Sequence, residues 1–259
     1  MVVPTSRRSG PMARWVKVLN AFVEREEWGT RDLAVSIDLS RSAVHRMLHE
    51  MAGLGLLTPS KGRGEFRVGP ELVRLAVLLA DHLDIRHVAR PVLDHTMERT
   101  GETVILALYA PSRRQFWAVD AAESSHPIRY IWESLRGWSD LYVGSSGKGI
   151  LAFLPDLERE AILDALPDPV PGLRPTSKED LRHELAEARR TGYVLSRGER
   201  FAGAIGVSAP VRDATGRVIG DVIISWPDNR SSAEKETSAA QAVLDAGEAI
   251  STGLGLRSG

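Results

Sequence analysis

The chain has 259 residues, of which 43% are hydrophobic and 26% charged, and this is the balance of an ordinary soluble globular protein. It contains no cysteine, which excludes disulfides, thiolate metal sites and cysteine nucleophiles. No apolar run approaches the ~20 residues that a transmembrane helix needs, and the N-terminal segment lacks the apolar core of a signal peptide. We therefore expect a cytoplasmic protein with no membrane partner.

The formal net charge of −1 hides an uneven distribution along the chain. Residues 1–80 contain 12 Lys and Arg against 8 Asp and Glu, whereas residues 81–259 contain 21 against 26. A basic front attached to an acidic remainder allows contact with nucleic acid at one end only. We expect residues 1–10, which include Arg7 and Arg8, to form a disordered basic arm.

Three short helices are predicted within residues 11–53. The first is marked by apolar residues at helical spacing: Trp15, Val18, Leu19 and Phe22. Gly29 ends this unit, and Thr30 is the expected N-cap of a second short helix. After a short turn, Ser40 is expected to cap a third helix over about 41–53.

The third helix has two contrasting faces. Its apolar stripe consists of Val44, Met47, Leu48 and Met51, and its opposite face carries Ser42, His45, Arg46 and His49, with Arg41 at the margin. Residues 56–59 and 65–68 predict two strands joined by a basic turn that contains Lys61 and Arg63. Helix, helix, short turn, helix and hairpin is the order of a winged helix-turn-helix, which we place at residues 11–69.

The remainder predicts linker helices and a second domain. Helical patterns begin at Glu71 and cover 85–99, so we expect residues 70–100 to connect two domains and to supply dimer contacts. Beyond residue 101, strands are expected at 103–109, 115–120, 193–196, 206–211 and 218–225, and helices at 146–154, 156–166, 178–191 and 232–253. This mixture predicts an α+β domain over 101–259 with a mainly antiparallel sheet.

Four segments carry a recognisable pattern. Residues 31–57 read RDLAVSIDLSRSAVHRMLHEMAGLGLL, residues 64–76 read GEFRVGPELVRLA, residues 145–155 read SSGKGILAFLP, and residues 189–227 read RRTGYVLSRGERFAGAIGVSAPVRDATGRVIGDVIISWP. They resemble, in order, four motifs of the IclR family of transcription regulators. These motifs are pSTVHRLLxTLxxxGxL, GxYRLGxxLLxLG, AxGKAxLAxLP and RxxGYaxsxeExxxGvxxiAaPVxdxxGxvxaalsvsgP. The resemblance covers nearly the whole chain.

The resemblance implies a GAF-like second domain with a six-stranded antiparallel sheet and flanking helices, in a protein that is a dimer or tetramer. The implied function is sequence-specific transcription regulation, in which a small-molecule effector modulates binding to double-stranded operator DNA. In this role the third helix enters the major groove, where side chains near its N-terminus read base edges. The expected DNA-binding residues are Ser40, Arg41, Ser42, His45 and Arg46 on the helix and Lys61 and Arg63 on the wing.

The resemblance also implies an effector cup in the second domain. Carried over residue by residue, its candidates are Gly144, Ser145, Ser146, Ser196, Gly206, Ile223 and Ser225. Backbone N–H groups at 144–147 precede the predicted helix and favour an anion, which points to a carboxylate ligand. Family members that bind small keto acids have an acidic residue, a cysteine and a serine at positions 196, 206 and 223. The exchanges in this chain predict a wider, less polar pocket for a larger organic acid, and His126–Trp132 and Trp138 are candidates for aromatic walls.

Other functions fit the sequence less well. The segment 144–148 resembles a phosphate-binding loop, but Tyr142 and Gly149 stand where that loop needs glycine and Ser or Thr. No GxSxG motif or catalytic triad is apparent, so we expect no enzyme activity, no catalytic residue and no cofactor. His45 and His49 have metal-ligand spacing, yet Arg46 replaces the glutamate of a zinc-protease motif. A winged helix used only for protein contacts is the remaining alternative, which the basic residues disfavour.

Overall fold

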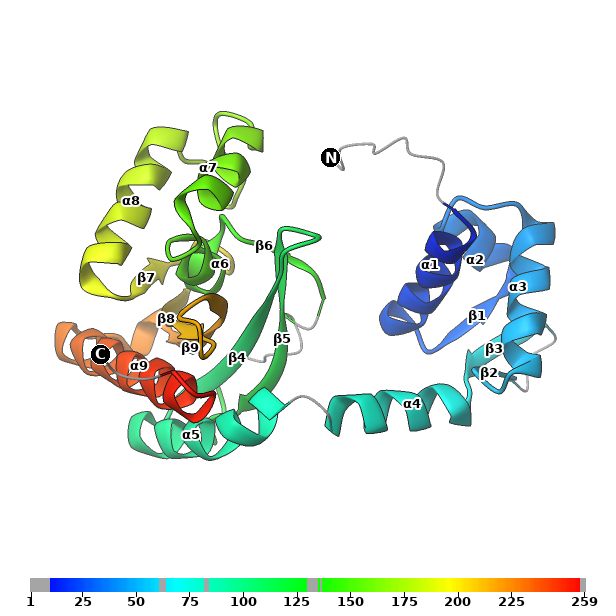
Figure 1. The fold of residues 1–259 in the computed structure, drawn as a ribbon, viewed down its shortest axis with the longest axis horizontal. Coiled ribbons are helices and arrows are strands. Elements are labelled where there is room, and N and C mark those ends of the chain that lie inside the picture. The colour runs from blue at the N-terminus through cyan, green and yellow to red at the C-terminus, as the bar shows by residue number, and fades with distance from the viewer. Residues whose placement is uncertain (1–9, 61–63, 82–83, 130–134, 136, 257–259) are drawn as a thin grey trace. The chain divides into compact units, whose positions relative to one another are not determined.

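The computed structural model of the chain describes residues 10–60, 64–81, 84–129, 135 and 137–256, and it divides into two compact units, residues 1–83 and 84–259 (Figure 1). The proposed basic arm falls mainly on residues 1–9, which lie outside the described residues. Within the described part, no helix is long and apolar enough to cross a membrane.

The N-terminal unit contains four helices and a small sheet among its described residues. In chain order the elements are α1 (Pro11–Glu24), β1 (Glu27–Gly29), α2 (Thr30–Ser36), α3 (Arg41–Gly53), β2 (Leu57–Pro59), β3 (Glu65–Val68) and α4 (Pro70–Asp81). The strands form an antiparallel sheet in the order β1-β3-β2. The sequence does not predict β1, because its three residues are too short for an alternating pattern. It forms by pairing with β3, which places Trp28 opposite Phe66.

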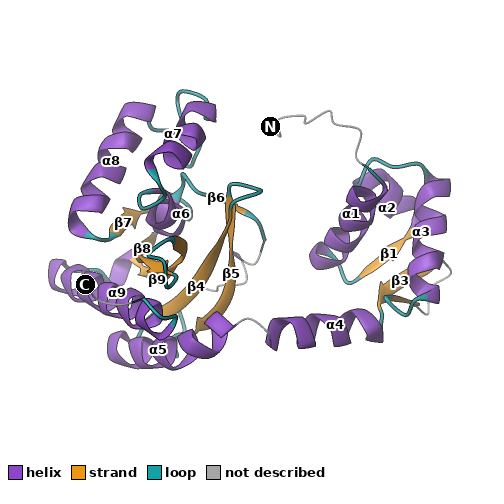
Figure 2. Ribbon diagram, in the orientation of Figure 1, coloured by secondary structure: helices purple, strands orange, loops and turns teal. Residues whose placement is uncertain are grey.

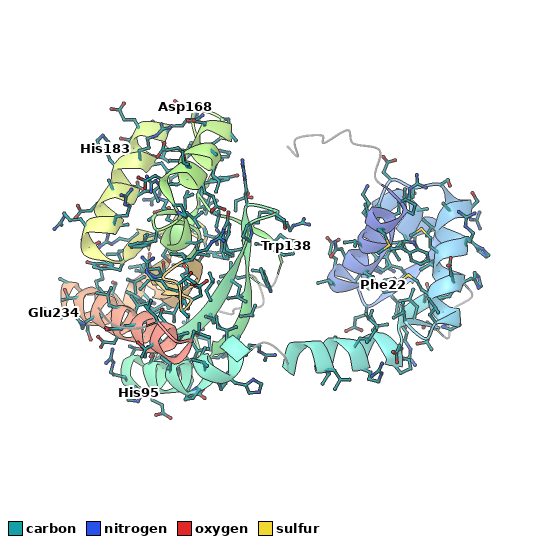
Figure 3. All side chains as sticks on the ribbon, in the orientation of Figure 1. Phe22, His95, Trp138, Asp168, His183 and Glu234 are labelled. Carbon is teal, nitrogen blue, oxygen red and sulfur yellow. The ribbon has the colours of Figure 1, made fainter. Side chains whose placement is uncertain are left out.

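The core of this unit is the apolar stripe of α3 packed on α1, α2 and the sheet. The stripe residues Val44, Met47, Leu48 and Met51 are buried, as the sequence predicts. Figure 3 shows Phe22 of α1 among the packed side chains of the same unit. Ser40 caps α3 as expected, because its Oγ accepts a hydrogen bond from the Ala43 N–H at 3.3 Å. The prediction that Thr30 caps α2 is wrong: Gly29, extended in β1, holds the N-cap position and Thr30 is already helical.

The C-terminal unit is a six-stranded antiparallel sheet with helices on both faces, as expected (Figure 2). Its helices are α5 (Asp84–Thr100), α6 (Gly144–Leu151), α7 (Asp156–Ala165), α8 (Lys178–Thr191), the short η2 (Asp228–Arg230) and α9 (Ala233–Gly253). Its strands are β4 (Thr103–Ala110), β5 (Gln115–Ala122), β6 (Ser139–Asp140), β7 (Val194–Arg197), β8 (Ala204–Arg212) and β9 (Val218–Pro227). The strand order is β6-β5-β4-β9-β8-β7.

Two hydrophobic clusters lie on opposite faces of this sheet. One contains residues of α6, α7 and α8, and the other contains residues of α5 and α9. The central strands β4, β8 and β9 are therefore buried on both faces, which explains their continuous apolar runs. Ser232 caps α9, since its Oγ accepts from the Lys235 N–H at 3.2 Å. The two-residue β6 is absent from the prediction because such a short strand has no periodicity.

A buried carboxylate connects the start of β4 to α9. Glu102, 1% exposed, precedes β4 and forms ion pairs with Arg230 and Lys235. Burial by itself would raise the pKa of Glu102, but the hydrogen bonds and charges of Arg230 and Lys235 lower it overall. Removing one cation from such a buried group costs more than losing a surface ion pair.

We expect Leu48→Ala to destabilise the N-terminal unit by about 2–5 kcal/mol, because it leaves a cavity under a side chain that is 0% exposed. The matched control is Leu54→Ala, at a side chain 63% exposed, which should change the free energy of unfolding by less than about 0.5 kcal/mol. Urea unfolding followed by tryptophan fluorescence reports on this core through Trp28. Equal effects of the two substitutions would contradict the packing described here.

Candidate functional site

Five residues at the start of α3 form an exposed polar surface, which we call the recognition face: Ser40, Arg41, Ser42, His45 and Arg46. In the part of the chain that the structure describes, neither Arg41 nor Arg46 forms a hydrogen bond or an ion pair. The Ser40 and Ser42 hydroxyls lie 3.4 Å apart. Because the opposite face of α3 is packed in the core, the side chains of Arg41 and Arg46 project into solvent.

The two histidines of α3 contact each other, and the second also contacts strand β3 of the hairpin. The ring centroids of His45 and His49 are 4.3 Å apart, and the ring of His49 meets that of Phe66 edge to face at 5.3 Å. His49 thus belongs to the contact between α3 and β3. Among the described residues, no group of three or more His, Asp or Glu is arranged to hold a metal ion.

The wing is described only in part. Lys61 and Arg63, predicted to contact the DNA backbone, lie outside the described residues. Arg67 on β3 is exposed, while its neighbour Phe66 is buried. Arg67 is not among the DNA-binding residues predicted from the sequence, although the alternation within residues 65–68 indicates that its side chain is exposed.

A cavity of about 30 Å³ lies in the C-terminal unit between the start of α6 and strands β7, β8 and β9. All seven residues carried over from the resemblance line it: Gly144, Ser145, Ser146, Ser196, Gly206, Ile223 and Ser225. Seven more residues complete the lining: Ile105, Leu135, Glu199, Arg200, Phe201, Ala204 and Ile205. Of these, the family pattern indicates only Glu199, as a residue near the pocket that anchors the loop by hydrogen bonds. Such a volume holds about two water molecules.

The first backbone N–H groups of α6 already have partners within the protein. The Gly144 N–H donates to Glu199 Oε2 at 3.2 Å, and the Ser145 N–H donates to Ser196 Oγ at 3.0 Å. Glu199 is in turn paired with Lys148, whose Nζ lies 2.7 Å from Glu199 Oε2 and which also pairs with Glu184. Glu199 therefore anchors the loop after β7 to α6, and the buried Lys148 neutralises it.

Arg200 brings a positive charge to the cavity wall. Its Nη2 donates to the backbone oxygens of Asp140 at 3.1 Å and Val143 at 2.5 Å, and its guanidinium lies 5.3 Å from the centre of the Phe116 ring. These contacts connect the loop after β7 with the segment that enters α6. Apart from its position next to Glu199, no local pattern indicates this role for Arg200.

Two expectations about the pocket differ from the structure. Gly206 does not widen it, because the hydroxyl of Ser145 occupies the space where a Cβ of residue 206 would lie. Trp138 is not part of the lining: it packs edge to face on Trp117 at 5.1 Å, under Arg113, and lies at the periphery of its unit (Figure 3). Phe201 supplies the aromatic side chain instead. Residues 130–132 of the other expected wall lie outside the described residues.

Comparison with known families agrees with this two-part architecture. Residues 12–60 match the IclR helix-turn-helix domain, and residues 77–252 match the C-terminal domain of bacterial IclR transcriptional regulators. The chain belongs to the IclR family. It is thus a transcriptional regulator with a DNA-binding domain and an effector-binding domain, and it is not an enzyme.

Individual IclR regulators resemble the chain over most of its length. It is 28% identical to the regulator BhcR of Paracoccus denitrificans over 87% of this chain and 80% of that protein. It is 24% identical to the probable regulator ArcR of Halobacterium salinarum over 86% of this chain and 85% of that protein. A solved IclR homologue from Microbacterium hydrocarbonoxydans, complexed with 4-hydroxybenzoate, is 29% identical with a TM-score of 0.79, covering 94% of this chain and 98% of that one.

We expect Gly206→Ala to destabilise this IclR-family chain by about 1–3 kcal/mol, because the added Cβ overlaps the Ser145 hydroxyl. In a Ser145→Ala background the same substitution should cost much less, since the remaining Ser145 Cβ lies at an ordinary 3.5 Å from the new atom. Thermal unfolding of the four variants measures this coupling. Gly137→Ala, where nothing lies within 4 Å, is the control. Additive effects would show that Ser145 does not fill the Gly206 site.

Proposed function

We propose that the recognition face of α3 reads operator DNA in the major groove. Arg41 and Arg46 offer guanidinium forks suited to guanine, while Ser40 and Ser42 stand at a helix start that favours a phosphate. Lys61 and Arg63 of the wing contact the flanking backbone in this proposal. The exposed, unpaired state of the two α3 arginines among the described residues is the observation that supports it best.

The active form in this proposal is a homodimer or tetramer on a near-palindromic operator. A two-fold protein contacts two half-sites. Support comes from α4, where Val73, Val77 and Leu78 leave apolar side chains 53%, 55% and 47% exposed. Apolar side chains gathered on one helix mark a surface for protein contact. Because the target is chromosomal DNA, we place the protein in the cytoplasm.

We further propose that the effector is a small organic acid bound at the α6 cavity. The charge of Glu199 is balanced by Lys148, which leaves Arg200 as the cation of the lining. The N–H groups of Gly144 and Ser145, now held by side-chain oxygens of Glu199 and Ser196, are donors that a ligand carboxylate can take over. The 4-hydroxybenzoate complex of the Microbacterium homologue supports an acid of this size.

In this scheme, ligand entry and helix movement are linked. A cavity of about 30 Å³ is too small for an aromatic acid, so in this proposal the Ser196 hydroxyl and the first turn of α6 move to admit the ligand. A ligand that binds one arrangement of α6 better than another shifts the population toward it, and such coupling to a second site is typically worth about 1–3 kcal/mol.

Arg46→Ala and Arg41→Ala should each weaken operator binding by about 1–3 kcal/mol, or roughly 5- to 150-fold, through loss of base or phosphate contacts. The DNA probe is the set of sequences that the wild-type protein enriches from a random duplex library. Arg190→Ala, an exposed arginine of α8, is the control and should bind normally. Failure of the wild-type protein to enrich any sequence, or a binding constant independent of salt, would favour the alternative of a protein-contact module.

The full-length protein should be thermally stabilised by 4-hydroxybenzoate and benzoate more than by the matching amides, because only the acids supply a carboxylate to the start of α6. Ser225→Leu should abolish this stabilisation, because the larger side chain fills the cavity. Operator binding should be intact, since residue 225 belongs to the C-terminal unit and α3 to the N-terminal unit. Equal stabilisation by acids and amides, or unchanged stabilisation in the Ser225 variant, would reject the proposed site.

A further inference from the structure

A buried polar pair lies one layer beneath the cavity, between α6 and strands β8 and β9. Asp221 and Ser208 are both 0% exposed. Asp221 precedes Ile223 by two residues on β9, and Ser208 follows Gly206 by two residues on β8, so each lies on the same face of its strand as a lining residue. Neither residue lines the cavity itself.

Gly149 of α6 provides the space for this pair. A Cβ at position 149 would overlap Ser208 Oγ and lie 2.7 Å from Asp221 Oδ2. Glycine at position 149 therefore makes room on α6 for the hydroxyl of Ser208 and the carboxyl of Asp221.

Ser208 ties strand β8 to the start of α6. Its hydroxyl donates to the Ser145 backbone oxygen at 2.7 Å. Ser145 lines the cavity, and its own N–H is held by Ser196. A serine hydroxyl has a single hydrogen to donate, together with acceptor lone pairs. The Ser208 hydroxyl can therefore donate its hydrogen to the Ser145 carbonyl or to a neighbouring carboxylate, but not to both.

Asp221 is the carboxyl that competes for this hydrogen. In the described residues neither of its oxygens has a hydrogen-bond partner at normal geometry, and burial raises its pKa well above the ordinary value. The nearby Ser208 hydroxyl and the Arg200 charge oppose that shift only in part. The facing positions on the other packed elements, Gly149 of α6 and Ala107 of β4, carry no charge.

We propose that Asp221 and Ser208 are positioning residues of the effector site, acting through the start of α6. When Asp221 is protonated it does not require a hydrogen from Ser208, and Ser208 donates to the Ser145 carbonyl, as in this structure. When Asp221 is ionised it takes that hydrogen, and the Ser145 carbonyl loses its tie to β8. This inference rests on the proposed role of the cavity as the effector site.

The test is hydrogen–deuterium exchange of the full-length chain without effector or DNA, comparing about pH 5 with about pH 9, the range that buried carboxyl groups span. Labelling times are scaled for the intrinsic pH dependence of amide exchange. The peptide covering 142–151 should be protected at low pH and lose protection as the pH rises through the raised pKa of Asp221. Loss of one hydrogen bond corresponds to about a fivefold change. The α9 peptide serves as the internal reference.

Three variants separate positioning from general stability. Asp221→Asn cannot ionise and keeps a donor for Ser208, so it should retain the low-pH protection of 142–151 at every pH. Ser208→Ala should leave this peptide weakly protected at every pH. Asp213→Asn, at a half-buried turn aspartate whose pKa is lowered by its hydrogen bond with Thr215, should behave like the wild type across the range.

The proposal is overturned if wild-type 142–151 shows no pH dependence beyond the intrinsic one, or if Asp221→Asn keeps the wild-type dependence. Should Asp221→Asn fail to fold, Ser208→Ala decides: persistence of the wild-type pH dependence in that variant also overturns it. The exchange experiment contains no effector and no operator, so a negative result there does not contradict the proposed function. The proposed function is tested separately, by operator binding and by acid binding.

Discussion

Helix α6 lies so close to strands β8 and β9 that its contact positions allow almost no side-chain volume. At position 149 a methyl group would collide with Ser208, and on the opposite side of the contact a methyl group at position 206 would collide with Ser145. Interiors packed at crystal-like density respond to single methyl groups. This close approach places the first turn of α6 directly over the sheet and gives the cavity its floor, its size and its hydrogen-bond donors.

The ion pairs around that turn centre on one buried ammonium group. Lys148 is 4% exposed and lies between Glu184 and Glu199, and Glu199 also accepts from the N–H of Gly144. Breaking such a pair strands a buried charge, which is strongly destabilising. The start of α6 is consequently held by carboxylate and hydroxyl oxygens, the kind of acceptor that the proposed acid effector would also supply.

In the N-terminal unit, the main constraint is the two-sided character of α3. Helices α1 and α2 and the small sheet must bury enough apolar surface on one side of α3 to leave its other side free for polar contacts. The stripe from Val44 to Met51 and the β1–β3 pairing achieve this, and His49 fills the contact with Phe66. Arg41 and Arg46 are left with no internal role among the described residues, which is what a surface that reads DNA requires.

Local patterns in the sequence determined the helices, the longer strands and the cap residues Ser40 and Ser232, because these depend on spacing and on neighbours a few residues away. The resemblance located seven of the fourteen residues that line the cavity. Pairing over long distances decided β1 and β6, which are too short to carry a periodic signal. Only the packing of α6 on the sheet revealed that Ser145 fills the space beside Gly206, that Arg200 joins the cavity wall, and that Asp221 and Ser208 are buried together beside Gly149. Those contacts join residues up to 72 positions apart, from Gly149 to Asp221, and no local pattern encodes them.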